Sequence, residues 1–138
     1  MTSVQTFCFS AIRLAFFSLI AFTVKAQPVV QGGVLTDAAG RTLYTFDKDQ
    51  ANKSNCQGGC LQNWPPYVAA PTAGAKPING VARFEHDDMQ HWTWNGSPLY
   101  YFIGDAKPGD RNGDGKGGVW HVVKPGASTA PVSTGSSY

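Results

Sequence analysis

Hydrophobic and polar residues alternate over short segments of the chain, and turn-forming residues separate these segments. Alternation with a period of two predicts half-buried β-strands. The predicted strands lie at residues 34–36, 41–46, 81–85, 90–94, 97–103 and 118–123. Helix-type periodicity is scarce, and the apolar residues are largely Val, Trp, Tyr and Phe. The sequence therefore predicts an all-β, β-dominated fold.

Two predicted turns carry residues that are typical of β-hairpins. Asp37 begins and Gly40 ends the first turn, and Asn95-Gly96 forms the second. Asn-Gly between two β-rich segments is a strong short-range hairpin signal. Pro98 follows the second turn, which places it at a strand start or at a sheet edge.

One pattern occurs twice in the chain, with a shift of 56 residues. Each copy reads G-x-x-L-Y-x-F-x-x-D and has a Trp fifteen residues after the Asp. The repeated side chains are Tyr44, Phe46, Asp49 and Trp64 in the first copy and Tyr100, Phe102, Asp105 and Trp120 in the second. We predict one compact domain of two pseudo-repeated β-hairpin units, with the aromatic residues in or near the core and the two Asp residues as turn caps. A repeated ligand site at the two Asp residues is the alternative.

The N-terminal segment has the features of a secretory signal peptide. Arg13 precedes an uncharged apolar run at residues 14–24, and small residues at 24 and 26 suit cleavage after Ala26. A run of 11 residues is too short to span a bilayer, which needs about 20. An uncleaved anchor is the alternative. We predict that residues 27–124 form the domain, with repeat halves at about 33–68 and 80–124, and that residues 125–138 form a disordered tail.

Removal of the signal peptide makes the formal charge of the mature chain zero. Arg13 and Lys25 leave with it, so nine of the 11 basic residues remain and balance nine acidic ones. The mature chain has no basic stripe and no polybasic segment. Its composition therefore argues against nucleic-acid binding and against attraction to an anionic membrane.

Two cysteines remain in the mature chain, Cys56 and Cys60. In an exported chain, two cysteines in one short loop predict a disulfide, and the two glycines between them allow a tight loop. A metal-binding or redox-active pair is the alternative. Cys8 precedes the apolar run, so no lipid-anchor cysteine follows that run. We predict a soluble exported protein, either periplasmic or secreted, with no transmembrane segment in the mature chain.

Four segments of the chain carry a resemblance to a known family. In order, they read LTDAAGRTLYTFDKD, SNCQGGCLQNWPPYVAA, TWNGSPLYYFIGDAKPGD and GGVWHVV. Together they resemble the bacterial secreted-repeat family, also described as predicted lipoproteins with a Y-x-(F/W/Y)-x-x-D motif. The resemblance covers residues 35–123 and implies export and the repeat. It implies no activity, because the molecular function of the family is not established.

This chain departs from the family pattern at residues 108–115, where relatives tend to read P-G-D-T-x-G-Q-G. Here Asp110, Asn112 and Asp114 precede Gly115 and match the first half of an EF-hand calcium loop. The twelfth position is His121 rather than Glu, so the bidentate ligand is missing. A calcium site is one hypothesis, and a surface turn rich in Gly and Asp is the alternative.

A second candidate metal site combines His86, Met89 and His91, with His121 as a further candidate. Imidazole and thioether ligands suit copper, particularly Cu(I). A turn at Asp87-Asp88 would bring the first three side chains together. The alternative is that these histidines are unrelated.

The sequence contains no nucleophile elbow, no H-E-x-x-H motif and no phosphate-binding loop. Trp92 and Trp94 share a strand face, and they suit either an aromatic binding platform or the core. We therefore predict a non-enzymatic envelope module that binds an unidentified partner or small ligand. The alternative from a different class is a metal-binding (copper) or electron-transfer accessory protein.

Overall fold

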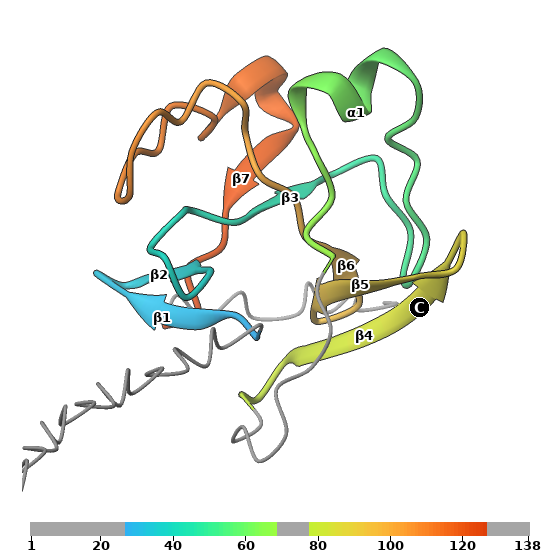
Figure 1. The fold of residues 1–138 in the computed structure, drawn as a ribbon, viewed down its shortest axis with the longest axis horizontal. Helices are drawn as coiled ribbons and strands as arrows, with labels where there is room; N and C mark the ends of the chain where they lie inside the picture. The colour runs from blue at the N-terminus through green and yellow to red at the C-terminus, as the bar shows by residue number, and fades with distance from the viewer. Residues whose placement is uncertain (1–26, 69–77, 127–138) are drawn as a thin grey trace, which may run out of the picture.

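The computed structural model describes residues 27–68 and 78–126 (Figure 1). The predicted signal peptide, most of the segment that connects the repeats and most of the predicted tail lie outside the described residues. The division of the chain into these parts therefore stays a prediction. In the described part of the chain, no helix has the length and apolar character needed to cross a membrane.

Short antiparallel strands make up most of the regular structure in the described residues. The elements are β1 (Val29–Gln31), β2 (Val34–Thr36), β3 (Tyr44–Phe46), α1 (Gly59–Asn63), β4 (Val81–His86), β5 (Met89–Trp94), β6 (Ser97–Pro98), the 3-10 helix η1 (Lys116–Gly118) and β7 (Trp120–Val122). They form three small sheets, β1–β2, β3–β7 and β4–β5–β6. The predicted β-dominated fold is confirmed.

The predicted strand at 97–103 is much shorter in the structure. Only Ser97 and Pro98 belong to a strand, β6. The N–H of Leu99 still donates to the carbonyl of Trp92 at 2.9 Å, but the N–H of Trp92 donates to Tyr67 instead of back to Leu99, so the ladder ends here. Beyond it, Tyr100 makes isolated bridges to Tyr44 and to Pro66. This segment therefore pairs with two parts of the first repeat instead of forming one long strand.

The two repeats interlock around a pseudo-two-fold axis. Tyr44 and Tyr100 exchange both backbone hydrogen bonds, at 2.9 and 3.0 Å. Further bonds occur in matched pairs: the N–H of Asp47 donates to the carbonyl of Val119 at 2.9 Å, and the N–H of Ile103 donates to the carbonyl of Asn63 at 2.9 Å. Figure 1 shows the β1–β2 hairpin on the left of the view and the β4–β5 hairpin on the lower right, with β3 and β7 above them.

A stack of four aromatic rings crosses the axis. In order, the rings are Phe46, Trp120, Trp64 and Phe102. The two indoles at its centre are parallel, with ring centroids 3.7 Å apart, and the outer pairs are separated by 4.3 and 4.4 Å. Tyr44 and Tyr100 each pack edge-on against the tryptophan of their own repeat, at 5.4 and 5.3 Å. The repeated aromatic residues thus form the contact between the repeats.

The end of each repeat completes the hairpin of the other repeat. Val123 of the second repeat accepts a hydrogen bond from Leu35 at 2.8 Å and donates one to Leu43 at 3.2 Å. In the matched place, Tyr67 of the first repeat accepts a hydrogen bond from Trp92 at 3.1 Å. A second core cluster of buried residues forms around these contacts. The hairpins therefore depend on both repeats for their packing.

Candidate functional site

The repeated tyrosines and aspartates bond across the axis to each other. The Tyr44 hydroxyl donates to Oδ2 of Asp105 at 2.6 Å, and the Tyr100 hydroxyl donates to Oδ2 of Asp49 at 2.7 Å. Burial raises the pKa of both phenols, so they remain protonated donors. Burial also raises the pKa of Asp49, although the hydrogen bonds from Asn55 and Tyr100 act to lower it. The sequence repeat did not reveal this exchange.

The second carboxylate oxygen of each repeated Asp holds the loop that follows it. Oδ1 of Asp49 accepts a hydrogen bond from the backbone N–H of Asn55 at 2.7 Å. Oδ1 of Asp105 accepts one from the backbone N–H of Asn112 at 2.9 Å. These contacts are of the turn-capping kind. Both oxygens of each carboxylate are therefore engaged inside the protein.

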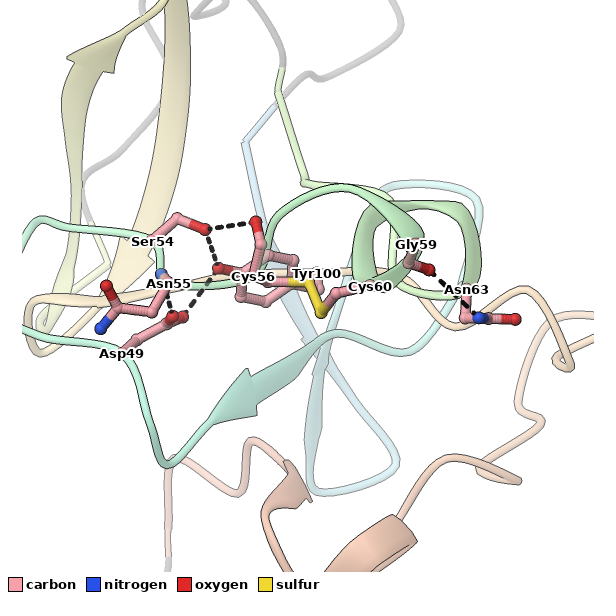
Figure 2. The surroundings of a disulfide bond; sticks show 8 residues. All are labelled: Asp49, Ser54, Asn55, Cys56, Gly59, Cys60, Asn63 and Tyr100. Carbon is pink, nitrogen blue, oxygen red and sulfur yellow. Dashed lines mark hydrogen bonds between the residues drawn. A yellow bond between two sulfur atoms is a disulfide. The ribbon is translucent and has the colours of Figure 1, made fainter.

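The predicted disulfide between Cys56 and Cys60 is confirmed, and it lies beside the Tyr100–Asp49 bond (Figure 2). Ser54 connects the two features, because its hydroxyl lies 2.6 Å from the Tyr100 hydroxyl and donates to the Cys56 carbonyl at 3.3 Å. The disulfide thus fixes the loop that surrounds one of the two cross-repeat hydrogen bonds.

The matched loop of the second repeat has no disulfide and packs through glycine. Asn55 and Asn112 occupy equivalent places, so Gly113 stands where the first repeat has Cys56. A Cβ at Gly113 would lie 2.7 Å from the ring of Trp64, which excludes a larger residue. The two loops therefore support the same core by different means.

The calcium-like residues lie in this second loop and are engaged there. Oδ2 of Asp110 accepts backbone hydrogen bonds from Ala106 and Lys107 at 3.0 and 3.1 Å. The backbone N–H and amide of Asn112 both donate within the loop, and Oδ1 of Asp114 accepts from the N–H of Val122 at 3.0 Å. A calcium ion would compete with these donors for the carboxylates, and the calcium site stays a prediction.

Two surface clefts lie in matched places around the axis. We call the first, of about 250 Å³, the aromatic cleft; it is lined by Arg41, Thr42, Pro65, Tyr101, Phe102, Ile103 and Asp105. We call the second, of about 420 Å³, the polar cleft; it is lined by Thr45, Asp47, Trp94, Asn95, Ser97, His121, Val122, Val123 and Lys124. The shift of 56 residues relates four pairs of lining residues: Arg41 and Ser97, Pro65 and His121, Tyr101 and Thr45, and Ile103 and Asp47. The clefts are copies of one surface with different side chains.

The aromatic cleft combines an apolar side chain, aromatic rings and a cation. The side chain of Ile103 is large and apolar, and the residue is 66% exposed. The Arg41 guanidinium lies 4.1 Å from the Tyr101 ring centroid and donates to the Tyr101 hydroxyl at 3.0 Å. Asp37 accepts from both groups, at 2.8 and 2.9 Å. The cation and the ring are therefore held in place before any ligand arrives.

The polar cleft has a different character. His121 Nε2 lies 2.7 Å from Asp47 Oδ2, and both side chains are about half exposed. His121 thus lines the polar cleft, whereas His86 and His91 line a different depression.

The remaining three candidate metal ligands lie together at the end of the β4–β5 hairpin. His86, Met89 and His91 line one depression of about 280 Å³. The His86 and His91 ring centroids are 5.7 Å apart, and Nε2 of His86 lies 3.3 Å from Oδ2 of Asp87. Burial lowers the pKa of His91, and the charge of His86 acts in the same direction. In residues 27–68 and 78–126, no group of three or more His, Cys, Asp or Glu side chains could hold a metal ion.

Comparison with known proteins identifies both repeats. The model of a family described as a secreted repeat of unknown function matches residues 29–67 and 87–124, more than half of the 138 residues. The two matched ranges are the two copies that interlock in the structure. No curated protein and no solved structure matches the chain.

Proposed function

We propose a binding function for this chain, which belongs to the secreted-repeat family of unknown function: an exported, soluble, non-enzymatic module that holds a protein partner at its aromatic cleft. The proposed location is the periplasm or the outside of the cell. The proposed occupant of the cleft is an apolar side chain of an envelope protein.

The repeated motif residues are occupied with contacts between the two repeats, and this supports the proposal. The repeated Tyr, Asp and Trp side chains bond or stack with each other across the axis. Since these contacts hold the repeats together, a binding function is better served by surface positions at which the copies differ. The two matched clefts are such a difference.

The single observation that carries the proposal is the exposure of Ile103 in the lining of the aromatic cleft. The side chain stands beside a preformed surface of Tyr101 and Arg41. Isolated exposed apolar side chains are ordinary on protein surfaces, but an apolar group beside a rigid aromatic wall and a cation resembles the centre of a protein interface. The first repeat has Asp47 in the matched place, so the fold itself does not require an apolar residue there.

The volume of the aromatic cleft favours a side chain over a whole small molecule. Pockets for drug-sized ligands have volumes of about 300–1,000 Å³. At about 250 Å³, the aromatic cleft is smaller than that range. Its size suits one or two side chains of a partner that covers the surrounding surface.

Photo-crosslinking in cells that export the chain tests the proposal, and the pseudo-symmetry supplies the control. A photoreactive phenylalanine analogue replaces Ile103 in one variant and Asp47 in the other. We expect one defined protein adduct from position 103 and none from position 47. Equal adducts from both positions, or none from either, would overturn the proposal.

Affinity measurements with the captured partner then test the chemistry of the cleft. Ile103→Asp gives the aromatic cleft the residue of the polar cleft, and we expect at least a tenfold loss of affinity. Asp47→Ile makes the reverse change on the other side, and the affinity should not change. Equal losses from the two variants would contradict binding at the aromatic cleft.

A further inference from the structure

The β4–β5 hairpin is longer than its counterpart in the first repeat. Trp92 of the second repeat and Leu35 of the first make equivalent backbone hydrogen bonds to the opposite repeat. The residues that precede them, His91 and Val34, therefore occupy equivalent positions. The β1–β2 ladder ends at the pair that includes Val34. The β4–β5 ladder continues beyond His91 for two more pairs, the last of which is His86 with Met89. This extension is therefore a feature of the second repeat only.

The extension places the candidate ligands on one face of the hairpin. Directly paired residues of antiparallel strands project to the same face, and residues two apart along a strand do so as well. His86 pairs with Met89, and His91 is two residues beyond Met89. The opposite face carries Glu85 and Gln90, which bond to each other at 3.1 Å. The three side chains thus converge by the geometry of the ladder.

His91 has an unused nitrogen in a buried position. The residue is only 5% exposed, and its Nε2 has no hydrogen-bond partner. A neutral imidazole nitrogen without a hydrogen-bond partner can donate its lone pair to a metal. The first repeat places Val34 here, so packing alone does not require a histidine.

The spacing of the two imidazoles fits a shared metal ion. A metal bound at about 2 Å by one nitrogen of each ring holds the ring centroids roughly 5 to 6.5 Å apart. The observed separation between His86 and His91 is 5.7 Å. His86 is about half exposed, so its ring has room to turn from Asp87 toward the depression.

The surroundings favour a soft cation. Met89 is 43% exposed and places a thioether in the same depression. Leu61 and Pro66 form apolar walls, and Cys56 contributes part of the disulfide loop. Two imidazoles and one thioether match the preference of Cu(I), whereas Ca²⁺ and Mg²⁺ require oxygen ligands.

We propose that His86, Met89 and His91 form a copper(I) site at the end of the second hairpin. This site lies apart from the aromatic cleft and shares no lining residue with it. It therefore goes beyond the proposed partner binding, and either proposal can fail without the other.

Competition for Cu(I) with the chromophoric chelator bicinchoninate tests the site. The mature protein is titrated without oxygen, with ascorbate as reductant, and mass spectrometry verifies that the disulfide is intact, because free thiols would bind Cu(I) themselves. We expect the wild-type protein to remove one equivalent of Cu(I) from the chelator. His91→Val installs the residue of the first repeat, and Met89→Leu removes the sulfur; each should weaken binding at least tenfold.

The third described histidine provides the matched control. His121→Gln removes an imidazole from the polar cleft and should leave Cu(I) affinity unchanged. X-ray absorption of the copper-loaded protein should show a sulfur neighbour that disappears in Met89→Leu. Failure of the wild-type protein to compete, an equal loss in His121→Gln, or a sulfur signal that persists in Met89→Leu would overturn the proposal. Circular dichroism of each variant separates loss of the site from loss of the fold.

Discussion

The two repeats have nearly the same interior and very different exteriors. Inside, the cross-repeat Tyr–Asp bonds measure 2.6 and 2.7 Å, and the edge-on Tyr–Trp contacts measure 5.4 and 5.3 Å. Outside, Ile103 stands where the other repeat has Asp47. The repeated motif therefore specifies the contacts between the two halves. The residues that bind a partner are expected at surface positions where the two repeats carry different side chains.

The loops that follow the repeated aspartates make the same point. The first repeat closes its loop with the disulfide, for which loop-closure entropy predicts a stabilisation of about 2 kcal/mol. The second repeat uses Asp110, which accepts two backbone hydrogen bonds and lies 3.0 Å from the Lys107 amine. One covalent bond thus supports the first loop, and polar contacts in a different part of the loop support the second.

Truncation of the central tryptophans should have the largest effect and tests the equivalence of the interiors. Trp64→Ala and Trp120→Ala each remove one of the two stacked, buried indoles. We expect each to lower the free energy of unfolding by about 3–5 kcal/mol, as for other buried aromatic residues. Urea denaturation at neutral pH measures both values. A cost for one variant less than half of that for the other would show that the interior is not symmetric in energy.

Removal of the tyrosine hydroxyls should have a smaller and unequal effect. Tyr100→Phe leaves both Asp49 and Ser54 without this partner, whereas Tyr44→Phe affects Asp105 and the N–H of Gly113, whose bond is long at 3.3 Å. Hydrogen bonds to charged groups contribute about 1.5–3 kcal/mol. We expect the loss in free energy of unfolding to lie near the upper end of this range for Tyr100→Phe and near the lower end for Tyr44→Phe, as measured by the same urea denaturation. A larger cost for Tyr44→Phe would contradict this order.

Replacement of His91 by valine should have the smallest effect, visible mainly as a dependence on pH. Burial lowers the pKa of His91 in the folded state below its ordinary value of 6.5. The unfolded chain therefore binds the proton first, and the stability of the wild-type protein falls as the pH drops below about 6.5. The slope from this residue is at most about 1.4 kcal/mol per pH unit. His91→Val should lack this loss, and urea denaturation between pH 7.5 and 5.5 measures the difference.

A wild-type stability that parallels that of His91→Val over this range would contradict the buried, neutral histidine. His121→Gln is the control, because its side chain is about half exposed and should not reproduce the effect of His91→Val.

The sequence predicted the features that depend on local chemistry. Alternating segments and the Asn-Gly turn predicted the β-dominated fold, and two close cysteines predicted the disulfide. The aspartates accept loop N–H groups, as a short acidic side chain after a strand commonly does. These features involve residues within a few positions of one another, so each can be predicted from a single segment of the sequence.

The exchange between the repeats was not predicted, because it joins residues about 50 to 60 positions apart. Nothing in the periodicity of the segment around Tyr44 indicates that its hydroxyl bonds to Asp105 instead of to its own loop. The short helix α1 was missed because only five residues form it, between a glycine and Trp64. The clefts did have a signal: in the alignment of the two copies, Tyr101 with Thr45 and Ile103 with Asp47 are among the positions that change character.

The exchanged Tyr–Asp bonds are the reciprocal contacts of a two-fold homodimer, realised inside one chain. A covalent connection keeps the second half near the first, so the two halves meet within one molecule. The assembly therefore does not depend on the concentration of the protein, as it would for separate subunits. Subunits of a homodimer share one coding sequence and must carry the same surface. Fusion removes that constraint, and one half can present an isoleucine where the other presents an aspartate.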